Sequence, residues 1–150
     1  MSRNIIVVKE DTSINDLIRI FVEHKISCVP VVNDKEKLVG IATKTDVLGY
    51  FLDIDLHISV KEALRDVLEY GAEQSDREEP PEKEMNVGAI MTPDPITAHE
   101  DTPVETLART MIENNIHRLI IMGNGTITGI VSTLDILYHV AGVEKKERKK

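Results

Sequence analysis

Two short motifs carry the groups in this chain that are best suited to binding chemistry. Each places a glycine, a hydroxyl residue and an aspartate at intervals of three: Gly40, Thr43 and Asp46, then Gly129, Ser132 and Asp135. A hydroxyl at a helix start, together with the unpaired N–H groups there, can hold a phosphate. A carboxylate one turn later can accept two hydrogen bonds from the vicinal diol of a ribose. With an apolar strand beside it for the base, each motif fits a nucleotide.

The same spacing also has an interpretation that needs no ligand. A hydroxyl followed three residues later by a carboxylate resembles a capping box, which satisfies the backbone at the start of a helix. The glycine then merely allows the chain to bend. For one motif taken alone this is the simpler interpretation, and the presence of two motifs favours a binding site.

The motifs occupy matching places in two copies of roughly 45 to 50 residues, a period that predicts a repeat architecture. Each copy has the pattern of strand, helix, strand, strand and helix, so the fold class is α/β (α+β). The first strands are predicted at residues 5–8 and 96–99, and the closing helices at 45–51 and 134–140. In the second copy, Thr102 is predicted as N-cap, with Pro103 as first helical residue and Glu105 completing a capping box.

The pattern divides the chain into four parts. Residues 1–51 form the first repeat, whose lead-in is truncated relative to that of the second, and residues 87–143 form the second repeat. Residues 52–86 do not repeat; they contain an amphipathic helix and an acidic, proline-containing linker. Residues 144–150 form a basic tail without apolar partners, which we expect to be disordered.

Composition narrows the function classes. A net charge of −8 over 150 residues argues against wide contact with nucleic acid or an anionic membrane surface. The one cysteine, Cys28, lies in an apolar run, where we expect a small core residue in a reducing compartment. Without a signal peptide or membrane span, the expected location is cytoplasmic. At 41% hydrophobic residues the chain can bury a sizeable core, although each repeat alone would be marginal.

The sequence favours a protein that is not an enzyme and requires no cofactor. It contains no set of nucleophile, base and oxyanion donors, no metal-ligand cluster and no phosphate-cradling glycine loop. Asp53, Asp55 and His57 could be offered as metal ligands, but that pattern has little specificity and fits solvated loop residues better.

The ordered, duplicated set of features resembles a tandem pair of cystathionine β-synthase (CBS) domains. The resemblance rests on both motifs, on the segment Ile90–Pro93 followed by Pro95, and on the run Ile26–Val32 with Pro30. It implies two β-α-β-β-α repeats packed through their sheets with pseudo-twofold symmetry, and two clefts that often bind adenosine-containing ligands. It also implies that Asp46 and Asp135 face ribose and that Thr43 and Ser132 lie near phosphate.

The two copies differ in charge. His117 and Arg118 resemble the basic pair that holds phosphate in the AMP-sensing γ subunits of the AMP-activated kinase, and an arginine fork can grip phosphate oxygens bidentately. The favoured site therefore lies in the second repeat and comprises Ile96, Thr97, His117, Arg118, Ser132, Thr133 and Asp135. The weaker site lies in the first and comprises Ile6, Val7, Ser27, Cys28, Thr43, Lys44 and Asp46.

Plainer roles remain open for several of these residues. Ser27 and Cys28 align with the basic pair but cannot replace it, and Lys44 is the substitute charge. Arg118 could instead pair with an acid of the linker, and His117 could be a surface residue. Ile96 and Thr97 fit ordinary strand residues.

We therefore expect a regulatory module that binds an adenine nucleotide or related adenosyl ligand. AMP or ADP is favoured over ATP or S-adenosylmethionine, because the guanidinium of Arg118 is suited to binding phosphate. Ligand binding would alter the packing of the repeats, and this change would be passed on through a homodimer or to a regulated enzyme or transporter. Neither nucleic acid nor a membrane is expected as a partner. The alternative is a ligand-free dimerisation or scaffold module in which both motifs are only helix caps.

Overall fold

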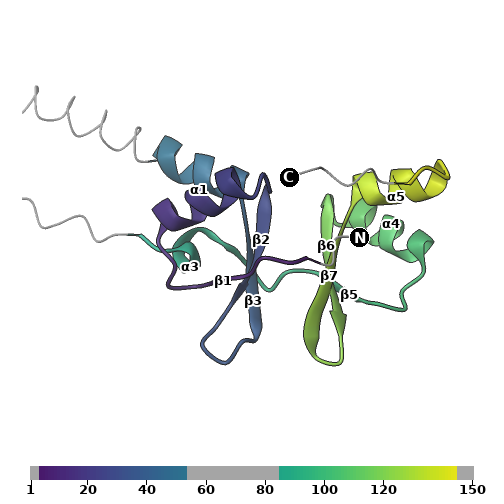
Figure 1. Cartoon of the computed structure of the whole chain (residues 1–150), viewed down its shortest axis with the longest axis horizontal. Helices are drawn as coiled ribbons and strands as arrows, with labels where there is room; N and C mark the ends of the chain where they lie inside the picture. The colour runs from purple at the N-terminus through teal and green to yellow at the C-terminus, as the bar shows by residue number, and fades with distance from the viewer. Residues whose placement is uncertain (1–3, 54–84, 145–150) are drawn as a thin grey trace, which may run out of the picture.

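The computed structural model describes residues 4–53 and 85–144. Two α/β halves lie side by side, one for each copy of the sequence pattern (Figure 1). The predicted amphipathic helix, the acidic linker up to residue 84 and the basic tail after residue 144 lie outside the described residues. Among the described helices, none has the length and apolar composition that a bilayer span requires.

Each half contains the predicted order of elements. The first half has β1 (Val8–Lys9), α1 (Ile14–Glu23), β2 (Cys28–Val32), β3 (Leu38–Thr43) and a helix that covers residues 44–53. The second half has β5 (Thr97–His99), α4 (Val104–Glu113), β6 (Arg118–Gly123), β7 (Thr126–Ser132) and α5 (Thr133–Val140). Between them lie α3 (Val87–Ile90) and β4 (Thr92–Pro93). The fold is therefore a mixed α/β pair of β-α-β-β-α repeats.

The strand registers show that the halves are true repeats. β1 runs parallel to β2 and β5 runs parallel to β6, whereas the β2–β3 and β6–β7 pairs are antiparallel. Cys28 pairs with Thr43 in the first half, and Arg118 pairs with Ser132 at the corresponding place in the second. Both hairpins shift register at equivalent positions near the end of β2 or β6, at Val31/Val32 and at Ile121/Met122. The repeat deduced from spacing is thus reproduced even in this irregularity.

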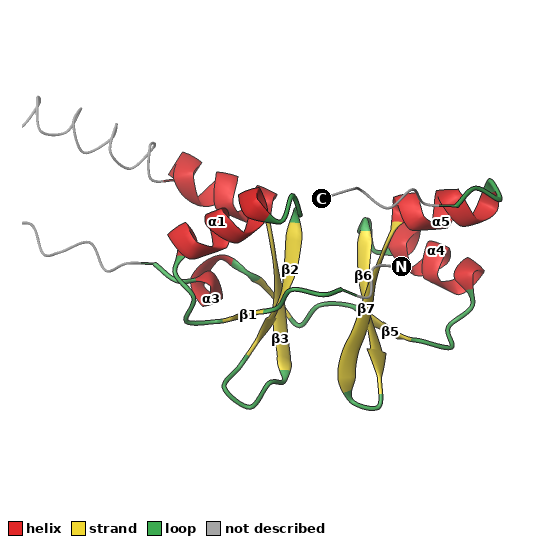
Figure 2. Cartoon of the chain, viewed as in Figure 1, coloured by secondary structure: helices red, strands yellow, loops and turns green. Residues whose placement is uncertain are grey.

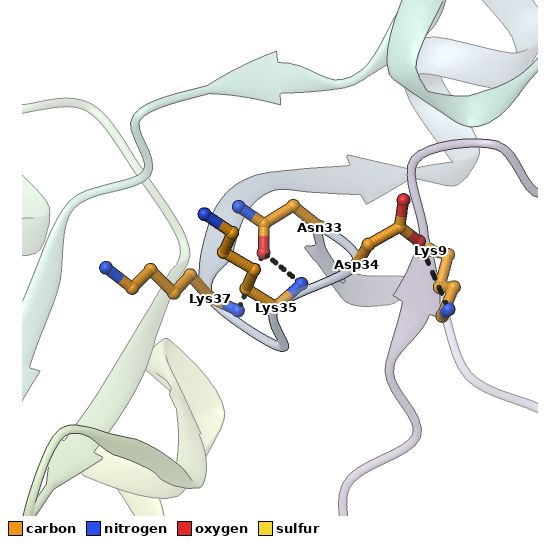
Figure 3. A network of polar contacts seen from close by, with 5 residues as sticks. All are labelled: Lys9, Asn33, Asp34, Lys35 and Lys37. Carbon is orange, nitrogen blue, oxygen red and sulfur yellow. Dashed lines mark hydrogen bonds and ion pairs between the residues drawn. The ribbon is translucent and has the colours of Figure 1, made fainter.

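The turns between these strands are formed by residues whose chemistry suits a tight turn. In the first hairpin Asn33 Oδ1 accepts hydrogen bonds of 3.0 Å from the backbone N–H groups of Lys35 and Lys37, and Lys9 forms an ion pair of 3.2 Å with Asp34 (Figure 3). In the second, Asn124 and Gly125 both have positive φ, 51° and 78°, as a two-residue hairpin turn requires.

The predicted starts of two elements are wrong. The first strand covers only Val8–Lys9, not residues 5–8. The second long helix starts at Val104, with Pro103 at the cap position and no side-chain cap. Thr102 does not cap the helix, because its hydroxyl accepts a hydrogen bond of 3.1 Å from the N–H of His99, behind it in the chain. In the first repeat Ser13 does cap its helix, accepting from Asp16 N–H.

Residues 85–93 pack against the first repeat, although they precede the second repeat in the chain. Val87 is fully buried in the core of the first repeat, and its N–H donates to Thr12 O at 2.8 Å. β4 extends the first sheet, pairing Thr92 with Ile41 and Pro93 with Gly40. The first sheet therefore has the order β1-β2-β3-β4, and the described second sheet has the order β5-β6-β7.

The helices cover the outer side of each sheet, and the inner sides face each other (Figure 2). Each outer side has its own apolar core, with Leu17, Val29 and Val31 at the centre of one, and Leu119 and Ile121 in the other. Successive strand residues point to opposite faces, so the residues between these positions point toward the opposite sheet. Pro30 and Ile120 stand there and are both buried. The inner faces therefore pack together, which places the starts of β2 and β6 near each other.

Candidate functional site

In both motifs the aspartate closes a reciprocal hydrogen-bonded cap. Thr43 donates to Asp46 Oδ2 from its N–H and from its hydroxyl, each at 2.7 Å, and receives the Asp46 N–H at 3.3 Å. Ser132 and Asp135 repeat the pattern at 2.8, 2.7 and 3.2 Å. The capping interpretation of the motif is therefore correct in geometry. It does not exclude a ligand, because each carboxylate has a second oxygen, and within the described residues Asp46 Oδ1 accepts no hydrogen bond.

The caps use backbone donors that a phosphate would otherwise find. Asp46 N–H and Asp135 N–H are bonded to the hydroxyls within the motifs. The N–H groups of Lys44 and Thr133 donate to the carbonyl oxygens of Ser27 and His117, at 3.1 and 3.0 Å. These helix starts therefore offer an anion fewer free N–H groups than the spacing alone predicts, and a cationic side chain becomes correspondingly more important.

The glycine of the first motif is explained by packing. A Cβ built on Gly40 would collide with Met91 Sδ and come within 3.0 Å of Thr92 O. Gly40 is an ordinary strand residue, paired with Val31 on one side and Pro93 on the other. It leaves room for the segment that returns to the first repeat, so the expectation that it allows a bend is not needed.

Arg118 reaches across the boundary between the repeats. It is the first residue of β6, and its Nη2 donates a hydrogen bond of 2.7 Å to Ser27 Oγ, just before β2 in the first repeat. The side chains are half-buried there, and no carboxylate of the described residues pairs with Arg118. The predicted phosphate-binding cation of the second repeat therefore lies beside predicted site residues of the first.

The same guanidinium influences the neighbouring thiol. Cys28 is 8% exposed, and burial raises the pKa of its thiol, while the positive charge of Arg118 opposes that rise. A buried thiol whose pKa is raised is a poor nucleophile, which agrees with the expected role of Cys28 as a small core residue.

The remaining predicted site residues fall into two groups. Lys44 and Thr133 are exposed, each directly after a motif hydroxyl, and His117 is exposed beside Arg118. Thr97 begins β5, an edge strand that β6 separates from β7, and Ile96 comes directly before it. Ile6 and Val7 come directly before β1, the edge strand that β2 separates from β3. Neighbouring strands are about 4.8 Å apart, so two inter-strand spacings, about 10 Å, separate β5, which contains Thr97, from β7, which contains Ser132. The first group lies next to the motif, and the second would have to be joined to it by a ligand that spans the sheet.

No cluster of three or more His, Cys, Asp or Glu side chains able to hold a metal occurs in the described ranges 4–53 and 85–144. Of the weak candidates, Asp53 is described and exposed, and Asp55 and His57 lie outside the described residues.

The family model of the CBS domain matches residues 1–53 and 87–142. The chain belongs to the CBS domain family. Its two halves are the two CBS domains of a pair, as the duplicated motif predicted, and the family assignment is confirmed along with the fold class.

Similar proteins and structures are found in archaea and plants. The uncharacterized protein MJ1426 of Methanocaldococcus jannaschii is 32% identical over 141 residues, which cover 88% of this chain and 83% of that protein. The chain spans only 40% of MJ1225 from the same organism and 56% of the chloroplast protein CBSX2 of Arabidopsis thaliana, at 26% and 27% identity.

Two solved CBS pairs contain adenosyl ligands. The structure of CBSX2 in complex with AMP has a TM-score of 0.67 and 26% identity, covering 93% of this chain and 89% of that one. The CBS pair of protein MJ0100, in complex with 5′-methylthioadenosine and S-adenosyl-L-methionine, has a TM-score of 0.69 and 26% identity, covering 93% of both chains.

Proposed function

We propose that this CBS pair is a regulatory module that binds an adenine nucleotide or a related adenosyl compound between its repeats. The observation that carries the proposal is Arg118: a half-buried cation at the boundary, hydrogen-bonded to a neutral hydroxyl and without a carboxylate partner in the described residues. A buried charge without a counter-ion is costly, and an anionic ligand would compensate it. The position of this cation supports AMP or ADP over ATP or S-adenosylmethionine.

The two solved pairs support the adenosyl part of the proposal. AMP, 5′-methylthioadenosine and S-adenosyl-L-methionine share adenine and ribose and differ in the group at the 5′ position. In this chain Asp46 and Asp135 would hold the ribose diol, with the unused Oδ1 of Asp46 as one acceptor. Thr43, Lys44, Ser132, Thr133, His117 and Arg118 would surround the 5′ group.

Ile96 and Thr97 in the second repeat, and Ile6 and Val7 in the first, would contact the base. Val7 and Ile96 are exposed at 45% and 39%, which leaves apolar surface for a flat ring just before the edge strand of each sheet.

The ligand would act by shifting the packing of the two repeats. A ligand changes a conformational equilibrium only through unequal affinity for the two arrangements. Arg118 is suited to that role, because it already joins the second repeat to the first through Ser27. A phosphate bound to Arg118 would therefore affect the packing of both repeats.

We further propose that two copies of the chain assemble through their helices. Apolar side chains are exposed at equivalent places on the outer helices of the repeats: Val22, Leu48 and Phe51 in the first, and Ile112, Leu137 and Val140 in the second. Exposed fractions from 44% to 80% on large apolar residues favour a protein contact. A regulated enzyme or transporter would read the state of this assembly.

Thermal unfolding of nucleotide-stripped protein with AMP, ADP, ATP, S-adenosylmethionine and adenosine tests the proposal. A ligand at 100 times its Kd adds about 2.7 kcal/mol to the free energy of unfolding, which raises the midpoint by roughly 5–10 °C for a protein of this size. We expect such a rise with AMP or ADP, and its loss in Arg118→Met. The absence of any shift at millimolar concentrations of all five compounds would refute the binding function.

A second function is favoured by a separate observation. Both motifs are complete reciprocal caps without any ligand, which is the arrangement expected of a ligand-free dimerisation or scaffold module. In that case the protein would assemble at the same concentration with and without nucleotide, and sedimentation velocity across a nucleotide titration distinguishes the two functions.

A further inference from the structure

Ser27 and Arg118 form a contact with an unusual sequence relationship. Ser27 aligns with His117, and Cys28 aligns with Arg118, so the contact joins non-equivalent positions of the two repeats. Its counterpart across the pseudo-twofold cannot form, because Cys28 has no guanidinium to offer His117. A single hydrogen bond therefore makes the boundary between the repeats asymmetric.

The hydrogen bond fixes the direction of the guanidinium. A free arginine loses about 2 kcal/mol of side-chain entropy when it is held in one rotamer, and a short bond to Ser27 removes most of that freedom before any ligand arrives. Arginine has five N–H donors in a planar fork, and the bond to Ser27 occupies one of them. The rest remain available for a bidentate contact with phosphate oxygens.

The surroundings of the contact support this orientation. Half-burial limits the number of directions open to Arg118, and the side chain lies close enough to Cys28 to oppose the effect of burial on the thiol. Ser27 is itself anchored, since its carbonyl oxygen accepts the N–H of Lys44 at the first motif. The acceptor that orients Arg118 is thus attached to the start of a capped helix.

We propose that Ser27 is a positioning residue that holds Arg118 in the orientation needed to bind the phosphate of an adenosyl ligand. Selectivity for phosphorylated over neutral adenosyl compounds is then set by a serine of one repeat acting on an arginine of the other. This inference rests on the proposed nucleotide-binding function and adds to it the residue that controls discrimination at the 5′ group.

The test compares AMP with adenosine on the full-length chain by isothermal titration calorimetry. In Ser27→Ala we expect the Kd for AMP to rise about three- to tenfold, because the net contribution of a typical hydrogen bond corresponds to roughly this change in affinity. The Kd for adenosine should change less than about twofold, because adenosine has no phosphate for Arg118. Ser27→Thr keeps the hydroxyl and should retain most of the affinity for AMP. Arg118→Lys should lose more affinity for AMP than Ser27→Ala does. Arg109→Lys, which changes an exposed arginine of α4, serves as the charge-matched control.

Each outcome decides one of the two proposals. Wild-type protein that binds neither compound overturns the proposed function and this inference with it. Wild-type protein that binds AMP with an unchanged Kd in Ser27→Ala overturns the inference alone. Tighter AMP binding in Ser27→Ala also overturns it, since Ser27 would then compete with phosphate, and an equal loss for AMP and adenosine would reduce Ser27 to a structural role.

Discussion

The thioether of Met91 lies directly against the α-carbon of Gly40, in the space that a Cβ would fill. Gly40→Ala should therefore destabilise the protein by about 1–3 kcal/mol through overpacking. Met91→Ala makes room, so the double variant should lose less than the sum of the single variants. Urea unfolding of the four proteins measures the coupling, and additive losses would show that Gly40 is needed for another reason.

Gly49 provides the matched control for that experiment. It lies in the helix over residues 44–53, and a Cβ there would meet nothing within 4 Å. Gly49→Ala should stabilise the chain by about 0.5–1 kcal/mol, because glycine is a poor residue for a helix interior.

The motif aspartates have two proposed roles, capping a helix and binding ribose. Ligand affinity distinguishes these roles, whereas the free energy of unfolding does not. Asp135 Oδ2 belongs to the cap of α5, so Asp135→Ala should cost about 1 kcal/mol of unfolding free energy whether or not a ligand binds. Ser132→Ala should cost a similar amount. If the carboxylate also binds ribose, Asp135→Ala should weaken the binding of adenosine at least tenfold. Ser132→Ala should leave the affinity for adenosine nearly unchanged. Equal affinities in the two variants would leave the aspartate as a cap only.

Stability should fall at alkaline pH because of Cys28. Burial raises the pKa of this thiol in the folded state, against the opposing charge of Arg118. The folded protein then holds the proton more tightly than the unfolded chain does. The full stability is present below the ordinary thiol pKa of about 8.5 and is lost as pH rises toward the folded value. Thermal midpoints of wild type between pH 7 and 10 should therefore drop more steeply than those of Cys28→Ala, and parallel curves would contradict the assignment.

Assembly through the helices should be sensitive to charge on the exposed apolar face. Leu137 is 61% exposed on α5, and its equivalent Leu48 is 62% exposed in the first repeat. Glutamate at either position would place a charge in the proposed contact and shift the protein toward monomer in sedimentation equilibrium, with little change in unfolding free energy. His139→Glu, an exposed polar position on the same helix, is the control. Wild-type protein that is already monomeric at high concentration would refute the assembly.

The sequence was sufficient for the features that repeat. Comparing the copies aligned Gly40, Thr43 and Asp46 with Gly129, Ser132 and Asp135, and these residues do occupy equivalent places at the strand-to-helix junctions. Periodic apolar positions such as Leu17 and Leu107 are buried as helical spacing requires. The predicted cap at Thr102 is wrong because more than one backbone N–H can donate to its hydroxyl. In the structure the N–H of His99 does so, and the helix starts at Val104 without a side-chain cap.

The contacts between repeats could not be predicted from either copy alone. The bond from Arg118 to Ser27 depends on how two sheets face each other, which hydrophobic periodicity does not encode. The sequence did contain one signal for this contact, because the aligned pairs differ in size. Ser27 and Cys28 are small, whereas the residues aligned with them, His117 and Arg118, are large. Likewise, β4 has only two residues, too few for a strand pattern, and its place beside β3 follows from Met91 filling the space above Gly40.

Val87 and β4 complete the first repeat from beyond the region that separates the copies, so the chain returns to the first repeat before it forms the second. A protease that cleaved between residues 53 and 85 would leave a C-terminal fragment that carries part of the core and of the sheet of the first repeat. The nicked protein should stay whole in solution and separate only on unfolding. The first repeat therefore cannot be transplanted by cutting in that region, whereas new chain ends introduced there should leave the two parts assembled.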